Sequence, residues 1–260
     1  MNVVVHTLGY NIAELVEEAT ESLYKLNPDG GFHHVIADLG YPLGTTRERW
    51  NEYFPHSVWE NARMLVDIAQ ANGSDLIRLP NVGVSQNWTS VAAIYGIGQG
   101  DLLIGADPDE RPITEGWVNA MATVIKNDPN IAIVALTLPE LLAIPNFFET
   151  YFEGEAIYDG VRVWYGKHVC QWALIGISGT FIQKVGGVPY PQTAPIYGWI
   201  EGACQPAMQS LGMRWVMLPD YHSGHIASSP LAQAWKNYVV TEEAMNAGQP
   251  TFEQWLQQHV

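Results

Sequence analysis

The sequence predicts an α/β domain built on an open, mostly parallel, doubly wound β-sheet. In the first half of the chain, short apolar runs alternate with amphipathic segments of helical period, in the order β-α-β-α-β-α-β-α-β. The chain has 260 residues, of which 47% are hydrophobic, so it is long and apolar enough for one large core. In such sheets the loops after the strands meet at one edge, and ligands bind there.

The predicted elements of the first half follow one another regularly. Apolar runs bounded by turn residues predict five strands, at 3–5, 33–38, 75–83 with its turn, 101–107 and 131–138. Apolar residues at helical spacing predict four helices between them, at 12–23, 59–71, 88–95 and 117–125. We expect loops at "HTLGYN", after Asp38, at Asn81–Gly83 and at "ADPDERP", and the adjacent His33 and His34 are expected to be exposed.

The second half is less regular. We expect a long loop with some helix over 139–160, strands at "VRVWYG" and "HVCQWALIG", and a short helix with a turn in "SGTFIQKVGGVPYP". An apolar stripe predicts a helix from Ile200 to Leu211 that ends at Gly212, followed by a strand over 214–218 and the loop "PDYHSGH". The tail after residue 230 is expected to be partly helical.

Composition limits the classes of function. Twelve basic residues against 27 acidic ones give a formal net charge of −15, which disfavours general binding to nucleic acid or to an anionic membrane. The same charge suits a site that holds a divalent cation among carboxylates. Two cysteines, Cys170 and Cys204, are too few for a disulfide framework and are expected to be buried thiols. The N-terminus has no signal-peptide pattern and no run reaches the length of a membrane span, so we expect a cytoplasmic protein.

Two acids end the fourth predicted strand, in "GDLLIGADPDERP". Asp107 and Asp109 are separated by Pro108, which restricts the backbone between them. Oxygen ligands of this kind suit Mg²⁺ or Mn²⁺, although acids also cluster in ordinary solvated turns. Arg111, two residues on, has two interpretations: it binds a phosphate, or it pairs within the neighbourhood of Glu110.

The surrounding segment favours the metal site over an ordinary solvated turn. From Asn81 to Pro112 the chain resembles the nucleotide-sugar-binding half of family 2 glycosyltransferases with the GT-A fold. That family has, in order, an Asn-x-Gly turn, a further Asn, an Ala-rich helix, a Gly-Asp pair and an Asp-x-Asp motif. The matching residues here are Asn81, Gly83, Asn87, Ala92–Ala93, Gly100–Asp101 and Asp107–Asp109.

The resemblance extends over roughly residues 1 to 225. It implies that the first strand and its loop, with Thr7 and Asn11, contact the nucleotide, and that Asp38 pairs with the edge of a uracil base. The run "DLGYPL" departs from the family's pattern at this point. Downstream, the resemblance implies that Glu201 is the catalytic acid residue of the family's Glu-Asp pair, with Ile200 in place of its first member. It also implies that His225 binds the metal, with His222 as the rival.

The implied function is therefore an inverting, metal-dependent glycosyltransferase of the hexosyltransferase kind. It would use Mn²⁺ or Mg²⁺ and a nucleoside-diphosphate sugar, with UDP as the expected nucleotide. Asp109 and His225 would hold the metal, Asp107 would contact the ribose or a metal-bound water, and Glu201 would be the base. Without the resemblance, Glu201 is also what a helix start favours, and a loop histidine is also an ordinary surface residue.

The expected organisation is a single domain over 1–230, with a nucleotide-sugar-binding half at 1–112, an acceptor-side half at 113–230, and a helical tail at 231–260. The acceptor stays open between a glycan, a lipid-linked sugar, a protein and a modified nucleic-acid base.

Two other functions are compatible with the sequence. One is a nucleotidyltransferase, which would want a basic, Gly-rich loop after the first strand that "HTLGYN" lacks. The other is a non-catalytic nucleotide-sugar or glycan-binding module.

Overall fold

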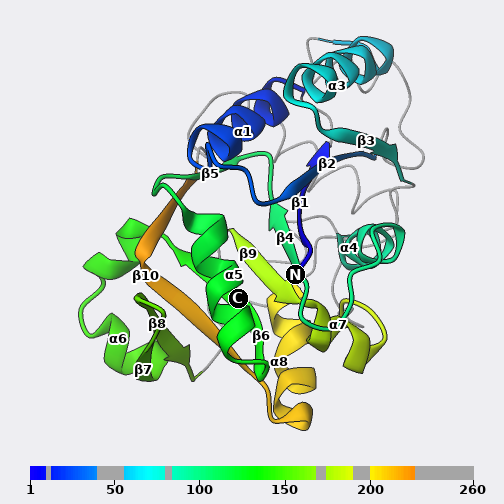
Figure 1. Ribbon diagram of the computed structural model, residues 1–260. Coiled ribbons are helices and arrows are strands. Elements are labelled where there is room, and N and C mark those ends of the chain that lie inside the picture. Colours follow the sequence, from blue (N-terminus) through cyan, green and yellow to red (C-terminus); the bar gives the residue numbers. More distant parts are fainter. Residues whose placement is uncertain (10–12, 40–55, 80–83, 168–173, 190–199, 226–260) are drawn as a thin grey trace, which may run out of the picture.

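A computed structural model of the chain describes all residues except 10–12, 40–55, 80–83, 168–173, 190–199 and 226–260. Its centre is a 10-stranded sheet with the strand order β3-β2-β1-β4-β9-β6-β10-β8-β7, from which β5 pairs with β10 (Figure 1). The strands are β1 (Val3–Gly9), β2 (His33–Asp38), β3 (Asp75–Arg78), β4 (Leu102–Ala106), β5 (Glu110–Pro112), β6 (Ile131–Thr137), β7 (Phe152–Tyr158), β8 (Val161–Gly166), β9 (Ile175–Ser178) and β10 (Arg214–His225).

The predicted fold class is confirmed. Strands β3, β2, β1 and β4 pair in parallel, as do β6 and β10. The exception at the centre is β9, which runs antiparallel to both of its neighbours, β4 and β6. It therefore joins the two parallel halves into one sheet.

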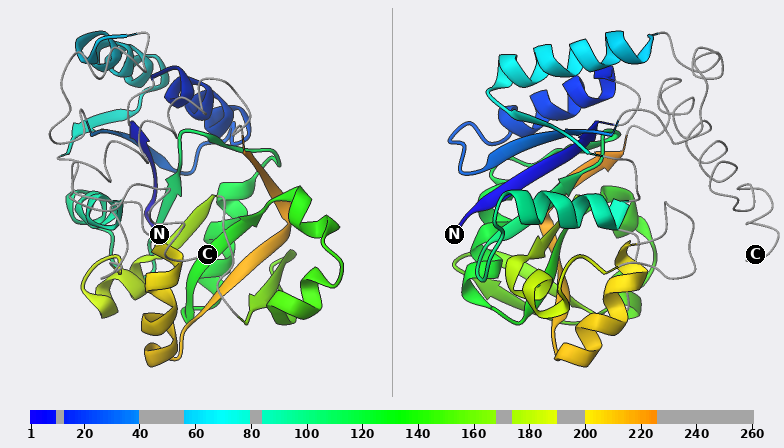
Figure 2. Two further views of the ribbon diagram at one scale, coloured as in Figure 1. Left: turned by 180° about the vertical axis from the view of Figure 1, so that it is seen from behind. Right: turned by 90° about the vertical axis from the view of Figure 1, so that its right-hand side faces the viewer.

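Helices cover both faces of the sheet, as Figure 2 shows. They are α1 (Ala13–Lys25), α3 (Val58–Asn72), α4 (Val84–Ile94), α5 (Trp117–Asn127), α6 (Phe147–Tyr151), α7 (Gly179–Val185) and α8 (Ile200–Leu211), with the 3₁₀ helix η1 at Pro139–Ala143. One buried cluster joins the sheet to α4, α7 and α8, and two others join it to α5 and to α1 with α3. The core is thus a sheet between two helical layers.

Local sequence explains where the helices begin and end. Ser57 accepts a hydrogen bond from the Glu60 amide while the Glu60 carboxylate accepts one from the Ser57 amide, so α3 begins with a capping box. Gly73 ends the same helix with a φ of 65°, a left-handed conformation that suits glycine. Gly212 follows α8 with a φ of 62°, as the sequence predicts.

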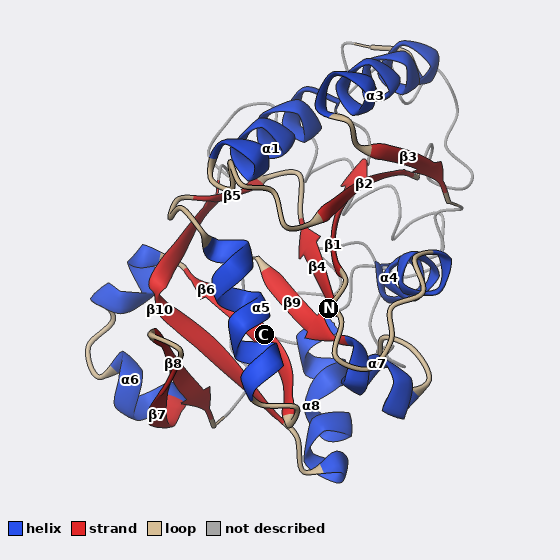
Figure 3. Cartoon of the chain, viewed as in Figure 1, coloured by secondary structure: helices blue, strands red, loops and turns tan. Residues whose placement is uncertain are grey.

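Two predictions for the second half are wrong. The segment 139–160 contains the strand β7 as well as helix, and the expected loop Pro219–His225 is the second half of β10. Figure 3 shows this long strand leaving the sheet's centre to reach β5 beside α1. The strands β7 and β8 form an antiparallel hairpin at the sheet's end.

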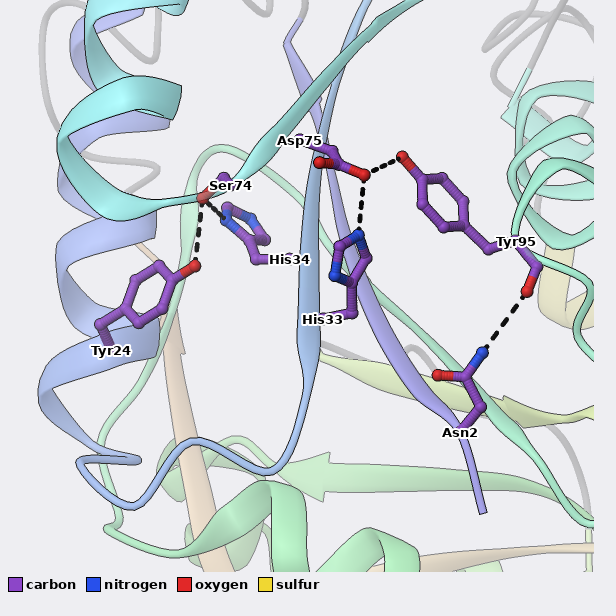
Figure 4. A network of polar contacts seen from close by, with 7 residues as sticks. All are labelled: Asn2, Tyr24, His33, His34, Ser74, Asp75 and Tyr95. Carbon is purple, nitrogen blue, oxygen red and sulfur yellow. Dashed lines mark hydrogen bonds and ion pairs between the residues drawn. The ribbon is translucent and has the colours of Figure 1, made fainter.

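The amino ends of β2 and β3 are joined by polar contacts (Figure 4). The Asp75 carboxylate binds the His33 ring at 2.9 Å and accepts a hydrogen bond from the Tyr95 hydroxyl at 2.9 Å. These two hydrogen bonds lower the pKa of Asp75. The network ties both strands to the end of α4, at the sheet edge opposite the candidate site described below.

His34 differs from its prediction, because it is 2% exposed rather than a surface residue. Its Nδ1 atom lies 2.8 Å from the Ser74 hydroxyl, which in turn lies 3.1 Å from the Tyr24 hydroxyl. Burial, with the neighbouring His33 as a smaller cause, lowers the pKa of His34 to about 3. Adjacent side chains of a β-strand point to opposite faces. The His34 ring meets Tyr24 of α1, whereas His33 is the first residue of β2 and lies beside Asp75 and Tyr95.

Candidate functional site

The candidate site is the edge where β1, β2 and β4 end. These strands are in register there, with Gly9 beside Asp38 and Thr7 beside Ala106. The carboxyl ends of these parallel strands thus meet at one edge, which is where open α/β sheets bind ligands.

The two acids after β4 have different surroundings. The Glu110 amide donates to the Asp107 carbonyl at 2.9 Å, which closes a tight turn over 107–110. Asp107 is exposed, whereas Asp109 is only 2% exposed. A buried carboxylate beside an exposed one suits a division between holding a cation and contacting a ligand from the solvent side.

Strand pairing brings a distant histidine to this turn. β5 begins at Glu110 and runs antiparallel to the end of β10, so that His225 stands opposite Glu110 and Gly224 opposite Arg111. The main chain of His225 therefore lies across from the residue that follows Asp109. The side chain of His225 is outside the described part of the structure.

His222, the rival ligand, is placed differently. Its main chain pairs with Thr137 of β6, and its amide donates to the Thr114 hydroxyl at 2.9 Å. Its Nε2 atom lies 3.0 Å from the Pro219 carbonyl. The last contact turns the His222 ring back toward its own strand, three residues before His225.

Asp38 closes β2, as predicted, and is 7% exposed. It is in register with Arg78, the last residue of β3, and the Arg78 Nε atom lies 3.8 Å from its carboxylate. The Arg78 side chain is 62% exposed, so this guanidinium is accessible to a ligand. Sequence reasoning missed Arg78, because its place beside Asp38 depends on the pairing of β2 with β3.

Thr7 and Asn87, two predicted nucleotide-binding residues, are buried below the surface of the candidate site. The Thr7 hydroxyl is fully buried, 3.1 Å from His34 Nε2. Asn87, in the first turn of α4, is 1% exposed, and its side-chain amide has no hydrogen-bond partner among the described residues. A direct role of either side chain in nucleotide binding stays a prediction.

His6 is a further buried histidine near these residues. Its ring meets the Trp88 ring edge to face at 4.5 Å, and neither ring nitrogen has a hydrogen-bond partner within the described structure. Burial, with His34 as a smaller cause, lowers the pKa of His6 to about 3. The ring is therefore neutral at physiological pH.

Several predicted site residues cannot be placed. Asn11, Asn81 and Gly83 lie outside the described residues. Glu201 is the second residue of α8, and its side chain also lies outside the description. Among the described residues no group of three or more His, Cys, Asp and Glu side chains is arranged around a metal position.

No described helix is both long enough and apolar enough to cross a bilayer.

The donor set nevertheless fits a divalent cation. Two aspartates belong to one tight turn, and the main chain of His225 pairs opposite Glu110 at its end. Carboxylate and imidazole side chains are ligand types that Mn²⁺ accepts. Asp109 and His225 are the residues that would hold it, and Asp107 would contact the ribose or a metal-bound water.

This fold, with its acidic turn between β4 and β5, is the GT-A fold. A mannosyltransferase from Pyrobaculum calidifontis, solved with GDP-Man and Mn²⁺, matches with a TM-score of 0.55 and 15% identity, over 95% of this chain and 63% of that enzyme. GalNAc-T7, solved with UDP, GalNAc and Mn²⁺, matches with a TM-score of 0.59 and 14% identity, over 96% of this chain and 52% of that enzyme. The chain thus spans less than two thirds of either transferase.

A UDP-glucose pyrophosphorylase is also similar, with a TM-score of 0.52, 12% identity, and coverage of 92% of this chain and 98% of that enzyme. At such identities the likeness establishes the fold alone. No protein-family model matches the sequence. No curated protein matches it either.

Proposed function

We propose that the protein is an inverting, metal-dependent glycosyltransferase related to family 2, using a UDP-sugar and a hydroxyl acceptor. The observation that carries the proposal is the pairing of β5 with β10. This pairing places His225 opposite Glu110, directly after Asp109, at the edge where β1, β2 and β4 end. The GT-A fold of the chain, shared with transferases solved with Mn²⁺ and nucleotides, supports it.

In the proposed reaction, an acceptor oxygen forms a bond to the anomeric carbon. The bond from that carbon to the diphosphate oxygen breaks, and its electron pair leaves with the diphosphate. Bound Mn²⁺ or Mg²⁺ would stabilise the negative charge of this leaving group. Asp109 and His225 would hold the cation, and Asp107 would face the ribose. Glu201 would accept the proton from the acceptor hydroxyl.

Asp38 and Arg78 are the proposed partners of the uracil base of the nucleotide. A carboxylate accepts a hydrogen bond from the N–H of a uracil edge, and the adjacent guanidinium donates to its carbonyl. The two side chains lie side by side at neighbouring strand ends, so they present an acceptor and a donor together.

The pyrophosphorylase likeness makes nucleotidyl transfer the second candidate, because the chain covers almost the whole of that enzyme. The expected loop "HTLGYN" is strand over its first four residues, which belong to β1. The segment has no lysine or arginine and one glycine, which disfavours triphosphate binding at the end of β1. A binding module without activity is the third candidate.

One set of assays separates the three. The protein is incubated with Mn²⁺ and UDP-glucose, UDP-galactose or GDP-mannose, and released nucleoside diphosphate is measured. A parallel reaction with UTP and glucose 1-phosphate is assayed for pyrophosphate. Release of nucleoside diphosphate supports the proposal, whereas pyrophosphate release alone, or tight UDP binding with no turnover of any donor, contradicts it.

The role of Glu201 has its own test. Glu201→Gln should keep UDP binding and lose most of the release of nucleoside diphosphate, because the amide cannot accept the proton. Isothermal titration and the release assay measure the two effects. Full activity in this variant would show that another residue is the base.

A further inference from the structure

Arg111 lies in β5 with its side chain turned into the protein. Its Nη1 atom donates to the carbonyls of Pro108 at 2.8 Å and Glu110 at 2.7 Å. Its Nη2 atom donates to the Leu15 carbonyl at 3.1 Å and to the Glu18 carboxylate at 3.2 Å. The guanidinium is only 11% exposed. Three of the four acceptors are thus main-chain carbonyls.

Two of these carbonyls belong to the residues on either side of Asp109. One nitrogen of Arg111 therefore holds both neighbours of this acid, in addition to the Glu110–Asp107 hydrogen bond that closes the turn. The path of the main chain through Asp109 is fixed at both ends. A carboxylate on such a backbone loses little further freedom when it binds a ligand.

The other contacts of Arg111 reach two more elements. Its Nη2 atom binds α1, the helix that follows the predicted nucleotide-binding loop. Its main chain pairs with Gly224 of β10, next to His225. Arg111 thus connects the acidic turn, α1 and the end of β10.

These contacts decide between the two interpretations of Arg111. A guanidinium has five N–H donors, and four are engaged with protein acceptors here. Burial lowers the pKa of Arg111, against the smaller raising effect of Glu18. Binding a phosphate would require these buried hydrogen bonds to break, which leaves the carbonyls without their donor.

We propose that Arg111 is a positioning residue that holds the turn of Asp107 and Asp109 against α1 and β10, and so sets the distance between Asp109 and His225 for a divalent cation. The part of the proposal that concerns the cation rests on the proposed function. The part that concerns the turn does not.

The test uses the full chain and two measurements. Hydrogen–deuterium exchange of the peptide over 107–113 reports the turn without any ligand. Binding of Mn²⁺ in the presence of UDP, followed by the electron paramagnetic resonance signal of free Mn²⁺, reports the cation site. Arg111→Ala should speed exchange in this peptide and weaken Mn²⁺ binding about tenfold or more, the usual effect of losing a residue that orients a metal ligand.

Arg162→Ala is the matched control. Arg162, on β8, makes an ion pair with Asp220 of β10, away from the turn. This variant should leave exchange over 107–113 and Mn²⁺ affinity unchanged. Glu18→Gln, which alters one of four contacts of Arg111, should have a smaller effect than Arg111→Ala on both.

Arg111→Lys keeps the charge but cannot hold two carbonyls and α1 together, because an ammonium group is a compact donor. It should give intermediate values and serves as the test if the alanine variant does not fold. Wild-type exchange and wild-type Mn²⁺ affinity in a folded Arg111 variant would overturn the proposal. If the wild-type protein does not bind Mn²⁺ with UDP, the proposed function fails, and faster exchange in the variant still supports the role of Arg111 in the turn.

Discussion

Among single residues, the two acids of the 107–110 turn differ most clearly in exposure. Asp109 is 2% exposed while Asp107 is exposed to solvent. If Asp109 holds the cation, Asp109→Ala should remove most Mn²⁺-dependent UDP binding, because a carboxylate is a principal ligand of a hard cation. Asp107→Ala should weaken it less. Isothermal titration with and without Mn²⁺ measures both.

Asp29→Ala provides the control for charge, since Asp29 is an exposed acid in the turn after α1. It lowers the negative charge equally and should leave UDP binding unchanged. Equal losses in the Asp29 and Asp109 variants would mean that overall charge, and not a metal ligand, governs binding.

The buried imidazole of His6 gives a prediction about acid stability. Its pKa is about 3 in the folded protein and about 6.5 when unfolded, so between these values the unfolded chain binds more protons. The contribution of neutral His6 to the free energy of unfolding is therefore fully present above pH 6.5. It is lost as the pH falls toward 3, and the loss is on the order of a few kcal/mol. His34 contributes in the same direction.

His6→Leu removes one of these two titrations and replaces an imidazole that has no hydrogen-bond partner in the described structure with an apolar side chain of similar size. The midpoint of thermal unfolding should fall less between pH 8 and pH 5 than in the wild type. An unchanged dependence in His6→Leu would contradict the assignment.

At the scale of elements, β10 shows where sequence reasoning fails and why. The residues Pro219–His225 contain proline, glycine and serine, which are typical of loops. The segment nevertheless forms strand because β6 pairs with it at His222 and β5 pairs with it from Ser223 to His225, after a register shift between Leu218 and His222. Those partners come from distant parts of the chain, and a local pattern does not contain them.

Other elements were predictable because their signals are local. The helices α1, α3 and α5 follow from their apolar stripes, and α3 also from its caps. The strands β2, β4 and β6 follow from continuous apolar runs. The direction of β9 and the pairing of Arg78 with Asp38 depend on tertiary contacts instead. The position of Asp107 and Asp109 at a strand end was visible in sequence, but their difference in burial was not.

The end of β10 also yields a prediction about the two histidines. The main chain of His225 lies opposite Glu110, while His222 pairs with Thr137. His225→Ala should therefore weaken Mn²⁺ binding in the presence of UDP, and His222→Ala should leave it close to wild type. Mn²⁺ titration of the two variants decides between them. A loss confined to His222→Ala would transfer the ligand role to that residue.

For the whole molecule, the formal net charge of −15 bears on how a nucleotide is bound. UDP is itself an anion, so the field of the protein opposes its approach. If the proposed function holds, we expect tight binding to require neutralisation of the diphosphate by a divalent cation. The charge and the acidic turn thus lead to the same expectation, which is strict dependence on the metal.

Thermal unfolding of the whole chain tests this expectation. A ligand at 100 times its Kd stabilises the folded state by about 2.7 kcal/mol, which raises the unfolding midpoint of a domain of this size by about 5–10 °C. Mn²⁺ with UDP should produce such a shift, whereas UDP alone should produce almost none, because the charge repulsion is then not offset. EDTA should reverse the shift, and Asp109→Ala should abolish it while Asp29→Ala keeps it. An equal shift with UDP in EDTA would show that the site binds the nucleotide without a cation, and would contradict the metal-dependent reaction proposed here.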